Sequence, residues 1–214
     1  MSRATLIAAS LWLVGCVTSQ RPPNLFDLGD FTEQRKPSSV LAADFVIEDV
    51  IQPTWIRSRD IVYRLDYESP SRAQRYAMSR WVAVPGELVT LRLRQAVQAA
   101  NAGFTLPAPN GPGSYFLQAN LEEFTQVFDA PSHSHCIVQL RTSLRRADGR
   151  VIGQNVFHIE VPAPTPDASG AALCLASAVN RASDQIVEWM SAVVAGGVPS
   201  GATGRATSAR STGE

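Results

Sequence analysis

"CIVQLRTSLRRADGRVIGQNVFHIEV", residues 136–161, alternates between apolar and polar side chains on both sides of the pair Asp148-Gly149. A period of two is typical of a strand with one buried face. Asp-Gly is a common turn between antiparallel strands because glycine readily accepts a positive φ. The stretch therefore predicts two strands, over 136–144 and 151–161, joined as a hairpin in an antiparallel sheet.

Upstream of this hairpin, four further segments have the aromatic and β-branched composition of strands. They are 42–51, 59–65, 74–79 and 115–128. Pro53 ends the first of them, and residues 25–29 add a short extended arm. The expected sheet therefore has about five or six strands.

Two other segments have the period of a helix. Over 85–101, Pro85 suits the first helical turn, and apolar residues recur at every third or fourth position. A second helix follows the proline-rich link 162–167, and its apolar stripe consists of Leu175, Val179, Ala182, Ile186, Met190 and Val193. We therefore predict an α+β fold, a two-layer sandwich of one mainly antiparallel sheet with two long helices on one face.

The beginning of the chain has the layout of a secretory signal peptide, assigned to residues 1–15. Arg3 precedes an apolar stretch, 6–14, that is shorter than the ~20 residues of a membrane-spanning helix. The junction Leu13-Val14-Gly15-Cys16 resembles the lipobox of bacterial lipoproteins, in which the cysteine thiol receives a diacylglyceryl group. Cys16 is therefore the expected lipidation site. The alternative is an ordinary secretory signal that is cut near residues 17–19.

The rest of the chain divides by composition. Residues 16–40 form a polar, proline-containing tether with a candidate short strand, and 41–195 form a single α+β domain. The segment 196–214 is dense in Gly, Ser and Thr and is predicted to be a disordered tail. By resemblance to Gram-negative lipoproteins, Val17 after the cysteine favours anchoring in the outer membrane, with the domain facing the periplasm.

Charge and cysteine content narrow the function further. The chain has 19 basic and 19 acidic residues, and this balance disfavours nucleic-acid binding. If Cys16, one of the three cysteines, carries lipid, Cys136 and Cys174 remain as a pair. We expect a disulfide between them in an oxidising compartment. The alternative is two buried thiols that do not meet.

No motif of catalysis or metal binding stands out. In the segment SHSHC, His133 and His135 share one strand face while Cys136 points to the other. The hairpin places His158 near Gln139, so no tetrahedral metal site is expected. Serine-hydrolase and phosphate-loop motifs are also missing from the sequence. We therefore expect no cofactor and no enzyme activity.

Residues 53–97 contain a series of marks in a specific order. They are Pro53 and Trp55, the strand Ile61-Val62-Tyr63-Arg64, Tyr76, the pair Arg80-Trp81, and the leucines Leu88, Leu91 and Leu93. With 121–129, the hairpin and the lipobox, these marks resemble the ABC-type transport auxiliary lipoprotein family, which includes the paraquat-inducible protein C lipoproteins. The resemblance covers most of 13–195 and departs from the commoner family pattern at 82–85.

The resemblance implies a partner role rather than chemistry. Such lipoproteins accompany MCE-type ABC systems, which move phospholipid or other hydrophobic compounds across the cell envelope. The implied partners are an MCE-domain protein, the ABC permease and the ATPase. Docking of transporter subunits is the leading function. The alternatives are a lipid-binding shuttle and an outer-membrane assembly lipoprotein.

Aromatic residues and arginine dominate the contact energies of protein interfaces. The candidate partner-binding residues are therefore Trp55, Tyr63, Arg64 and Trp81. A tryptophan directly before a helix, such as Trp81, more often fills the hydrophobic core, and that alternative stays open here.

Overall fold

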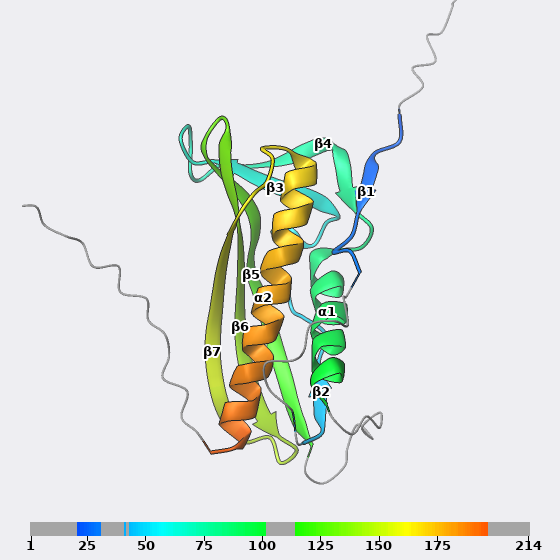
Figure 1. Ribbon diagram of the computed structural model, residues 1–214, viewed down its shortest axis with the longest axis vertical. Coiled ribbons are helices and arrows are strands. Elements are labelled where there is room, and N and C mark those ends of the chain that lie inside the picture. Colours follow the sequence, from blue (N-terminus) through cyan, green and yellow to red (C-terminus); the bar gives the residue numbers. More distant parts are fainter. Residues whose placement is uncertain (1–20, 31–40, 42, 102–113, 197–214) are drawn as a thin grey trace, which may run out of the picture.

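The computed structural model describes residues 21–30, 41, 43–101 and 114–196. Within these ranges, seven strands form one sheet, and two long helices pack side by side on one face of it (Figure 1). The prediction of an α+β fold is therefore confirmed. The predicted signal peptide, Cys16 and nearly all of the predicted tail lie outside the described residues.

The predicted segments appear in the predicted order, with some different bounds. The strands are β1 Asn24–Phe26, β2 Phe45–Ile47, β3 Asp60–Leu65, β4 Ala73–Trp81, β5 Tyr115–Ala130, β6 His133–Arg146 and β7 Val151–Pro162. The helices are α1 Pro85–Ala100, α2 Ala168–Val194 and a short 3-10 helix, Thr54–Ile56. The three long strands β5, β6 and β7 follow one another in the chain and form the greater part of the sheet.

The sheet combines antiparallel and parallel pairs in the order β1-β4-β3-β5-β6-β7, with β2 paired to the beginning of β5. The pairs β3–β4, β5–β6 and β6–β7 are antiparallel, and the last of them is the predicted hairpin. The pairs β1–β4, β2–β5 and β3–β5 are parallel. The parallel pair β3–β5 needs a long connection. β4 and α1 provide it, and α1 carries the chain back so that β5 can run in the same direction as β3.

A β-bulge in β5 places two consecutive glutamates on the same face of the sheet. The register of β5 against β6 shifts between Leu121 and Glu123. A bulge adds one residue to one strand, so side chains on either side of it fall out of simple alternation. Leu121 and Phe124 consequently both point into the core, while Glu122 and Glu123 both lie on the opposite face.

The hydrophobic core lies between the sheet and the helices. Alternate residues of β6, namely Val138, Leu140 and Leu144, are completely buried beneath α2. Gly153 of β7 permits the close approach of this helix, since a Cβ atom there would lie 3.0 Å from the ring of Trp189. The alternation read from the sequence therefore defines which face of the hairpin the helix covers.

A buried arginine fastens the N-terminal arm to both helices. Arg92 of α1 is only 4% exposed. Its Nη2 donates to the carbonyl oxygens of Leu28 and Gly29 at 3.0 and 2.6 Å, and its Nη1 donates to Oδ1 of Asn180 in α2 at 2.7 Å. Burial lowers the pKa of Arg92 from its ordinary value. These charge-assisted bonds hold the arm that contains β1 against the domain.

Candidate functional site

The four residues that the sequence indicated as partner contacts do not form one surface. Trp81 is completely buried, with its ring centre 5.5 Å from that of Phe124. It is a core residue, and we correct its assignment as a contact because no part of it reaches solvent. Trp55 lies in the short 3-10 helix and is 43% exposed. Tyr63 and Arg64 are neighbours on β3 and point to opposite faces of the sheet.

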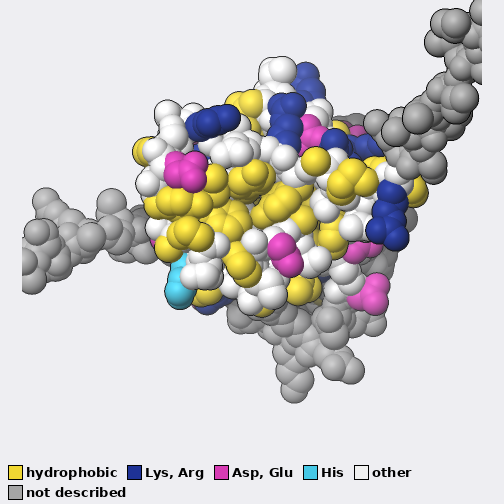
Figure 2. All heavy atoms as spheres, turned by 90° about the horizontal axis from the view of Figure 1, so that it is seen from above, with side chains coloured by type: hydrophobic (Ala, Val, Ile, Leu, Met, Phe, Trp, Pro, Cys, Tyr) yellow, Lys and Arg dark blue, Asp and Glu magenta, His cyan; other side chains and the backbone are white. Residues whose placement is uncertain are grey.

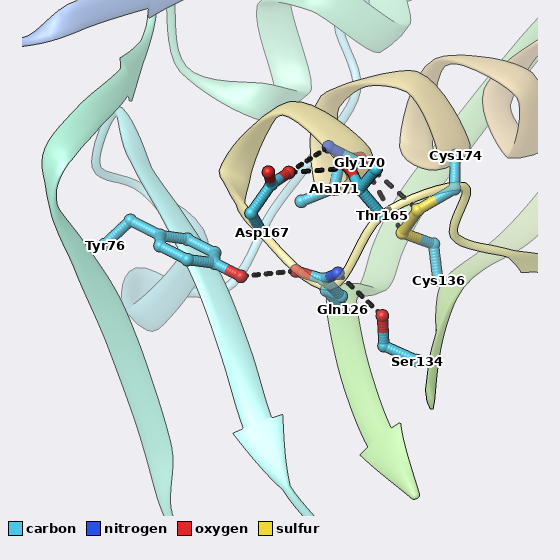
Figure 3. Close-up of a disulfide and its surroundings, with 9 residues drawn as sticks. All are labelled: Tyr76, Gln126, Ser134, Cys136, Thr165, Asp167, Gly170, Ala171 and Cys174. Atoms are coloured by element: carbon cyan, nitrogen blue, oxygen red, sulfur yellow. Dashed lines mark hydrogen bonds between the residues drawn. A yellow bond between two sulfur atoms is a disulfide. The ribbon is translucent and has the colours of Figure 1, made fainter. Parts of the chain in front are cut away.

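Tyr63 lies on the helix-covered face in a small aromatic cluster. Its ring centre is 4.7 Å from that of Tyr76 and 5.8 Å from that of Phe128. The hydroxyl of Tyr63 donates to Oε1 of Gln74 at 3.1 Å. The hydroxyl of Tyr76 donates to Oε1 of Gln126 at 2.7 Å (Figure 3). Burial raises the pKa of Tyr76 well above its ordinary value. Tyr76 therefore keeps its hydroxyl proton at physiological pH.

The same end of the domain is fastened by a disulfide and a helix cap. Cys136 of β6 is joined to Cys174 of α2, with their Cα atoms 5.7 Å apart (Figure 3). At the start of α2, the carboxylate of Asp167 accepts from the N–H of Gly170 and from the hydroxyl of Thr165, each at 2.8 Å. These bonds, that of Gly170 first, lower the pKa of Asp167 below its ordinary value. The disulfide and the cap together hold the start of α2 against β6.

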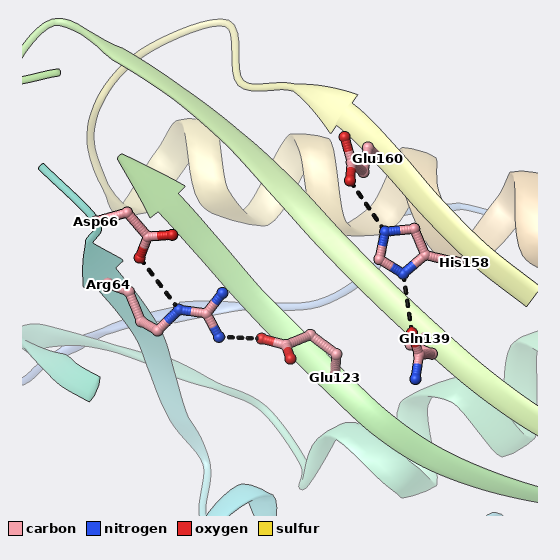
Figure 4. A network of polar contacts seen from close by, with 6 residues as sticks. All are labelled: Arg64, Asp66, Glu123, Gln139, His158 and Glu160. Atoms are coloured by element: carbon pink, nitrogen blue, oxygen red, sulfur yellow. Dashed lines mark hydrogen bonds and ion pairs between the residues drawn. The ribbon is translucent and has the colours of Figure 1, made fainter. Parts of the chain in front are cut away.

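The opposite face of the sheet has a different character, because no described helix covers it. On β3, the guanidinium of Arg64 contacts two carboxylates (Figure 4). Its Nη1 lies 2.6 Å from Oε1 of Glu123, and its Nε lies 3.4 Å from Oδ1 of Asp66. The side chains of Arg64 and Glu123 are 23% and 25% exposed, so this ion pair is only partly screened by solvent.

A second group of polar contacts continues across β5, β6 and β7. Glu122 accepts from Nε of Arg141 at 2.6 Å and from Nε2 of Gln139 at 2.7 Å. These two donors, Arg141 foremost, lower the pKa of Glu122. Oε1 of Gln139 lies 2.9 Å from Nδ1 of His158, whose Nε2 lies 3.0 Å from Oε1 of Glu160 (Figure 4). Both ring nitrogens of the histidine therefore face acceptors.

We refer to these side chains together as the open-face network. Its members are Arg64, Asp66, Glu122, Glu123, Gln139, Arg141, His158 and Glu160. Four neighbouring strands contribute to it, and charges of both signs lie within hydrogen-bond distance of one another. Such an arrangement is suited to recognising a charged protein surface by exchange of partners.

The histidine-rich segment forms no metal centre in the described part of the chain. Cys136 is held in the disulfide. Nδ1 of His135 lies 2.9 Å from Oδ2 of Asp129, and Nδ1 of His133 lies 3.1 Å from the hydroxyl of Ser132. Among the described residues, no three side chains of His, Cys, Asp or Glu are grouped so that they could hold a metal ion.

Sequence reasoning chose only Arg64 of the open-face network as a contact residue, although it also placed His158 near Gln139, where the structure has it. The other residues are ordinary polar positions of alternating strands, and their proximity depends on register. One signal was present in the sequence, because the alternation of β5 breaks after Leu121. Interpreted as a bulge, this break would have placed Glu122 and Glu123 on the same face and indicated a local concentration of charge.

Comparison with solved structures shows relatives of the same fold. Protein XCC0632 from Xanthomonas campestris, described as a member of family DUF330, is 15% identical with a TM-score of 0.64, over 82% of this chain and 95% of that chain. An uncharacterized protein is also 15% identical, with a TM-score of 0.59 over 80% of this chain and 100% of that chain. No curated protein matches the sequence. At such low identity, the solved structures support the fold and not a function.

A family model provides the assignment. The model of the ABC-type transport auxiliary lipoprotein component matches residues 26–187, which run from β1 into the second half of α2. Within the described residues, no helix is both long enough and apolar enough to cross a membrane. The marks over 53–97 predicted the same family, and that prediction is confirmed. The chain therefore belongs to the ABC-type transport auxiliary lipoprotein family.

Proposed function

We propose that this chain is a lipid-anchored docking subunit of an MCE-type ABC transport system, which moves phospholipid or another hydrophobic substrate across the cell envelope. The observation that supports it is the family match over 26–187, since the family is an auxiliary component of ABC-type transport. In this role, Cys16 bears the lipid, and the domain faces the periplasm from the outer membrane. The domain binds transporter subunits and catalyses no reaction.

The open-face network is our candidate for the docking surface. The helices occupy the other face of the sheet, whereas charges from four strands meet on this one (Figure 4). A partner with complementary charges would replace the internal pairs of Arg64 and Arg141 by pairs across the interface. Trp55, which is 43% exposed, and the partly exposed Tyr63 remain candidate contacts outside the network.

Affinity purification of the tagged full-length protein from its own membranes tests the proposal. We expect the MCE-domain protein, the permease and the ATPase to be recovered with the wild-type chain and to be reduced several-fold by Arg64→Glu. Arg94→Glu is the matched control, because Arg94 pairs with Asp49 on the helix side. Recovery of phospholipid without a protein partner indicates a shuttle, and recovery of a β-barrel indicates an assembly factor. Either result contradicts docking.

The anchor has its own test. We expect Cys16→Ser to release the domain from membranes into the soluble fraction. Mass spectrometry of the wild-type mature chain should find a diacylglyceryl group on the cysteine thiol and an acyl group on its amine. An unmodified cysteine would contradict the lipid anchor. It would not contradict docking through the open-face network, which the affinity purification tests.

A further inference from the structure

Exposed aliphatic side chains gather at the end of the domain where α2 begins. Leu25 of β1, Val82 after β4 and Leu173 in α2 are 57%, 43% and 64% exposed. These three residues, which we call the apolar end, line one groove of about 410 Å³, together with Phe26 and Ala172. Figure 2 looks onto this end of the molecule, where hydrophobic side chains form a band that has both arginines and acidic side chains beside it.

Such a surface is unfavourable in water. Contiguous exposed apolar patches on soluble proteins mark places where a partner, a ligand or a membrane is bound. The pairing of β1 with β4 brings Leu25 close to Val82, and Leu173 of α2, far away in the sequence, lines the same groove. The fold therefore assembles this patch from three separate elements, so the patch is not a feature of one amphipathic helix.

The length of chain before β1 indicates what the apolar end contacts. This step rests on the proposed lipid anchor at Cys16. Seven residues lie between that cysteine and Asn24, the first residue of β1, and the eight Cα–Cα steps from Cys16 to Asn24 span at most about 28 Å when fully extended. The opposite end of the domain is about 40 Å away along β7, which has 12 residues. The anchor thus keeps the apolar end close to the bilayer surface.

We propose that the apolar end rests in the interfacial region of the phospholipid bilayer, with Leu25, Val82 and Leu173 inserted among the headgroups. Peripheral domains bind membranes in this way, by combining buried apolar area with nearby cationic groups. Arg59 supplies such a cation, because its exposed Nη1 lies 3.5 Å from the carbonyl oxygen of Val82. Asp27 also lines the groove, and its carboxylate accepts from the N–H of Gly29 at 2.7 Å.

This contact determines how the domain stands on the membrane. β5, β6 and β7 run from the apolar end to the hairpin at the other end of the molecule (Figure 1). With the apolar end on the bilayer, these strands stand upright and the open-face network faces sideways. A transporter subunit then approaches the network parallel to the membrane surface, without having to displace lipid.

Quenching of tryptophan fluorescence by brominated phosphatidylcholine tests the proposal in the full lipidated protein. The mature chain, from which the leader with Trp12 has been cleaved, is reconstituted in vesicles in a Trp55→Phe background, which leaves the buried Trp81 and Trp189 as a constant contribution. Leu173→Trp reports on the apolar end. Val151→Trp is the matched control, because Val151 is 51% exposed and begins β7 at the far end.

With bromine atoms placed on the acyl chains close to the headgroups, we expect quenching to remove about half of the fluorescence that the new tryptophan of Leu173→Trp adds. Almost none of the fluorescence added by Val151→Trp should be quenched. Vesicle flotation of both variants verifies the anchor separately. Flotation with no quenching at either site overturns the membrane contact and leaves the anchor intact. Equal quenching at both sites also overturns it, as does blue-shifted, unquenched emission from Leu173→Trp, which would show protein covering the patch. Failure of the protein to float with the vesicles contradicts the lipid anchor, and the membrane contact of the apolar end is then contradicted as well.

Discussion

The two faces of the long hairpin differ although they alternate along the same strand. On the covered face, Val138 and Leu140 of β6 are completely buried beneath α2. Gln139 and Arg141, which alternate with them along β6, belong to the open-face network and donate to the carboxylate of Glu122 on β5. Apolar packing on one face supplies most of the stability, and this leaves the other face free to carry charged side chains. Substitutions on the two faces should therefore have separable effects.

The largest effect on stability is expected at Trp81, on the covered side. Trp81→Ala should lower the free energy of unfolding by about 3–5 kcal/mol, because it leaves a cavity in a fully buried site. Trp81→Phe is the control. It keeps most of the packing and removes an indole N–H that has no hydrogen-bond partner among the described residues. Chemical denaturation measures both, and an equal loss for the two variants would contradict a packing role.

The disulfide is the next test of the covered face. The double variant Cys136→Ala, Cys174→Ala should lower the free energy of unfolding by about 2–4 kcal/mol, because the bridge closes a long loop in the unfolded chain. Reduction of the wild-type protein by dithiothreitol should give a comparable loss in thermal melts. The double variant should then show no further response to the reductant. An unchanged melting temperature after verified reduction would contradict this account.

The helix cap predicts a smaller, pH-dependent effect. Asp167→Ala should cost about 1 kcal/mol at pH 7. Since the bonds from Gly170 and Thr165 lower the pKa of Asp167 in the folded state, its stabilisation is present above the ordinary pKa near ~4 and is lost as the pH falls below it. The difference between the wild type and the alanine variant should shrink on acidification. Asp167→Asn, which caps without a charge, should show no such change.

The smallest effect on stability is expected on the open face. A double-mutant cycle with Arg64→Met and Glu123→Gln should give a coupling energy of about 1 kcal/mol or less, as is usual for ion pairs near the surface. Raised salt concentration should reduce this energy further. If the network serves docking, the same variants should still impair recovery of transporter subunits. A coupling of several kcal/mol would instead assign the pair a structural role.

The local parts of the fold could be predicted from the sequence. The hairpin follows from the alternation around Gly149, which has a φ of +86°, and α1 begins at Pro85 as expected. These features depend on residues close together in the chain. The parallel pairing of β1 with β4 depends instead on distant segments, and the sequence pattern contains no direct signal of it.

The candidate site was harder to predict for the same reason. Tyr63 and Arg64 were chosen by residue type, and the strand directs them to opposite faces. As a tryptophan, Trp81 was a candidate for an interface, and as a residue directly before a helix it was equally a candidate for the core. Only its surroundings in the folded structure distinguish the two roles. The open-face network arises from the register of four strands and one bulge, so it became visible only when the pairing was known.

The attachment of β1 has a mechanical consequence. The chain enters the domain at Asn24 and runs parallel to β4, where the N–H of Val82 donates to the carbonyl oxygen of Phe26 at 2.8 Å. A pull on the N-terminal segment therefore acts along the strand, so it shears several hydrogen bonds at once instead of peeling them off one by one. Beyond β1, Arg92 donates hydrogen bonds to the carbonyl oxygens of Leu28 and Gly29. Together these contacts resist tension at the point where the chain enters the domain.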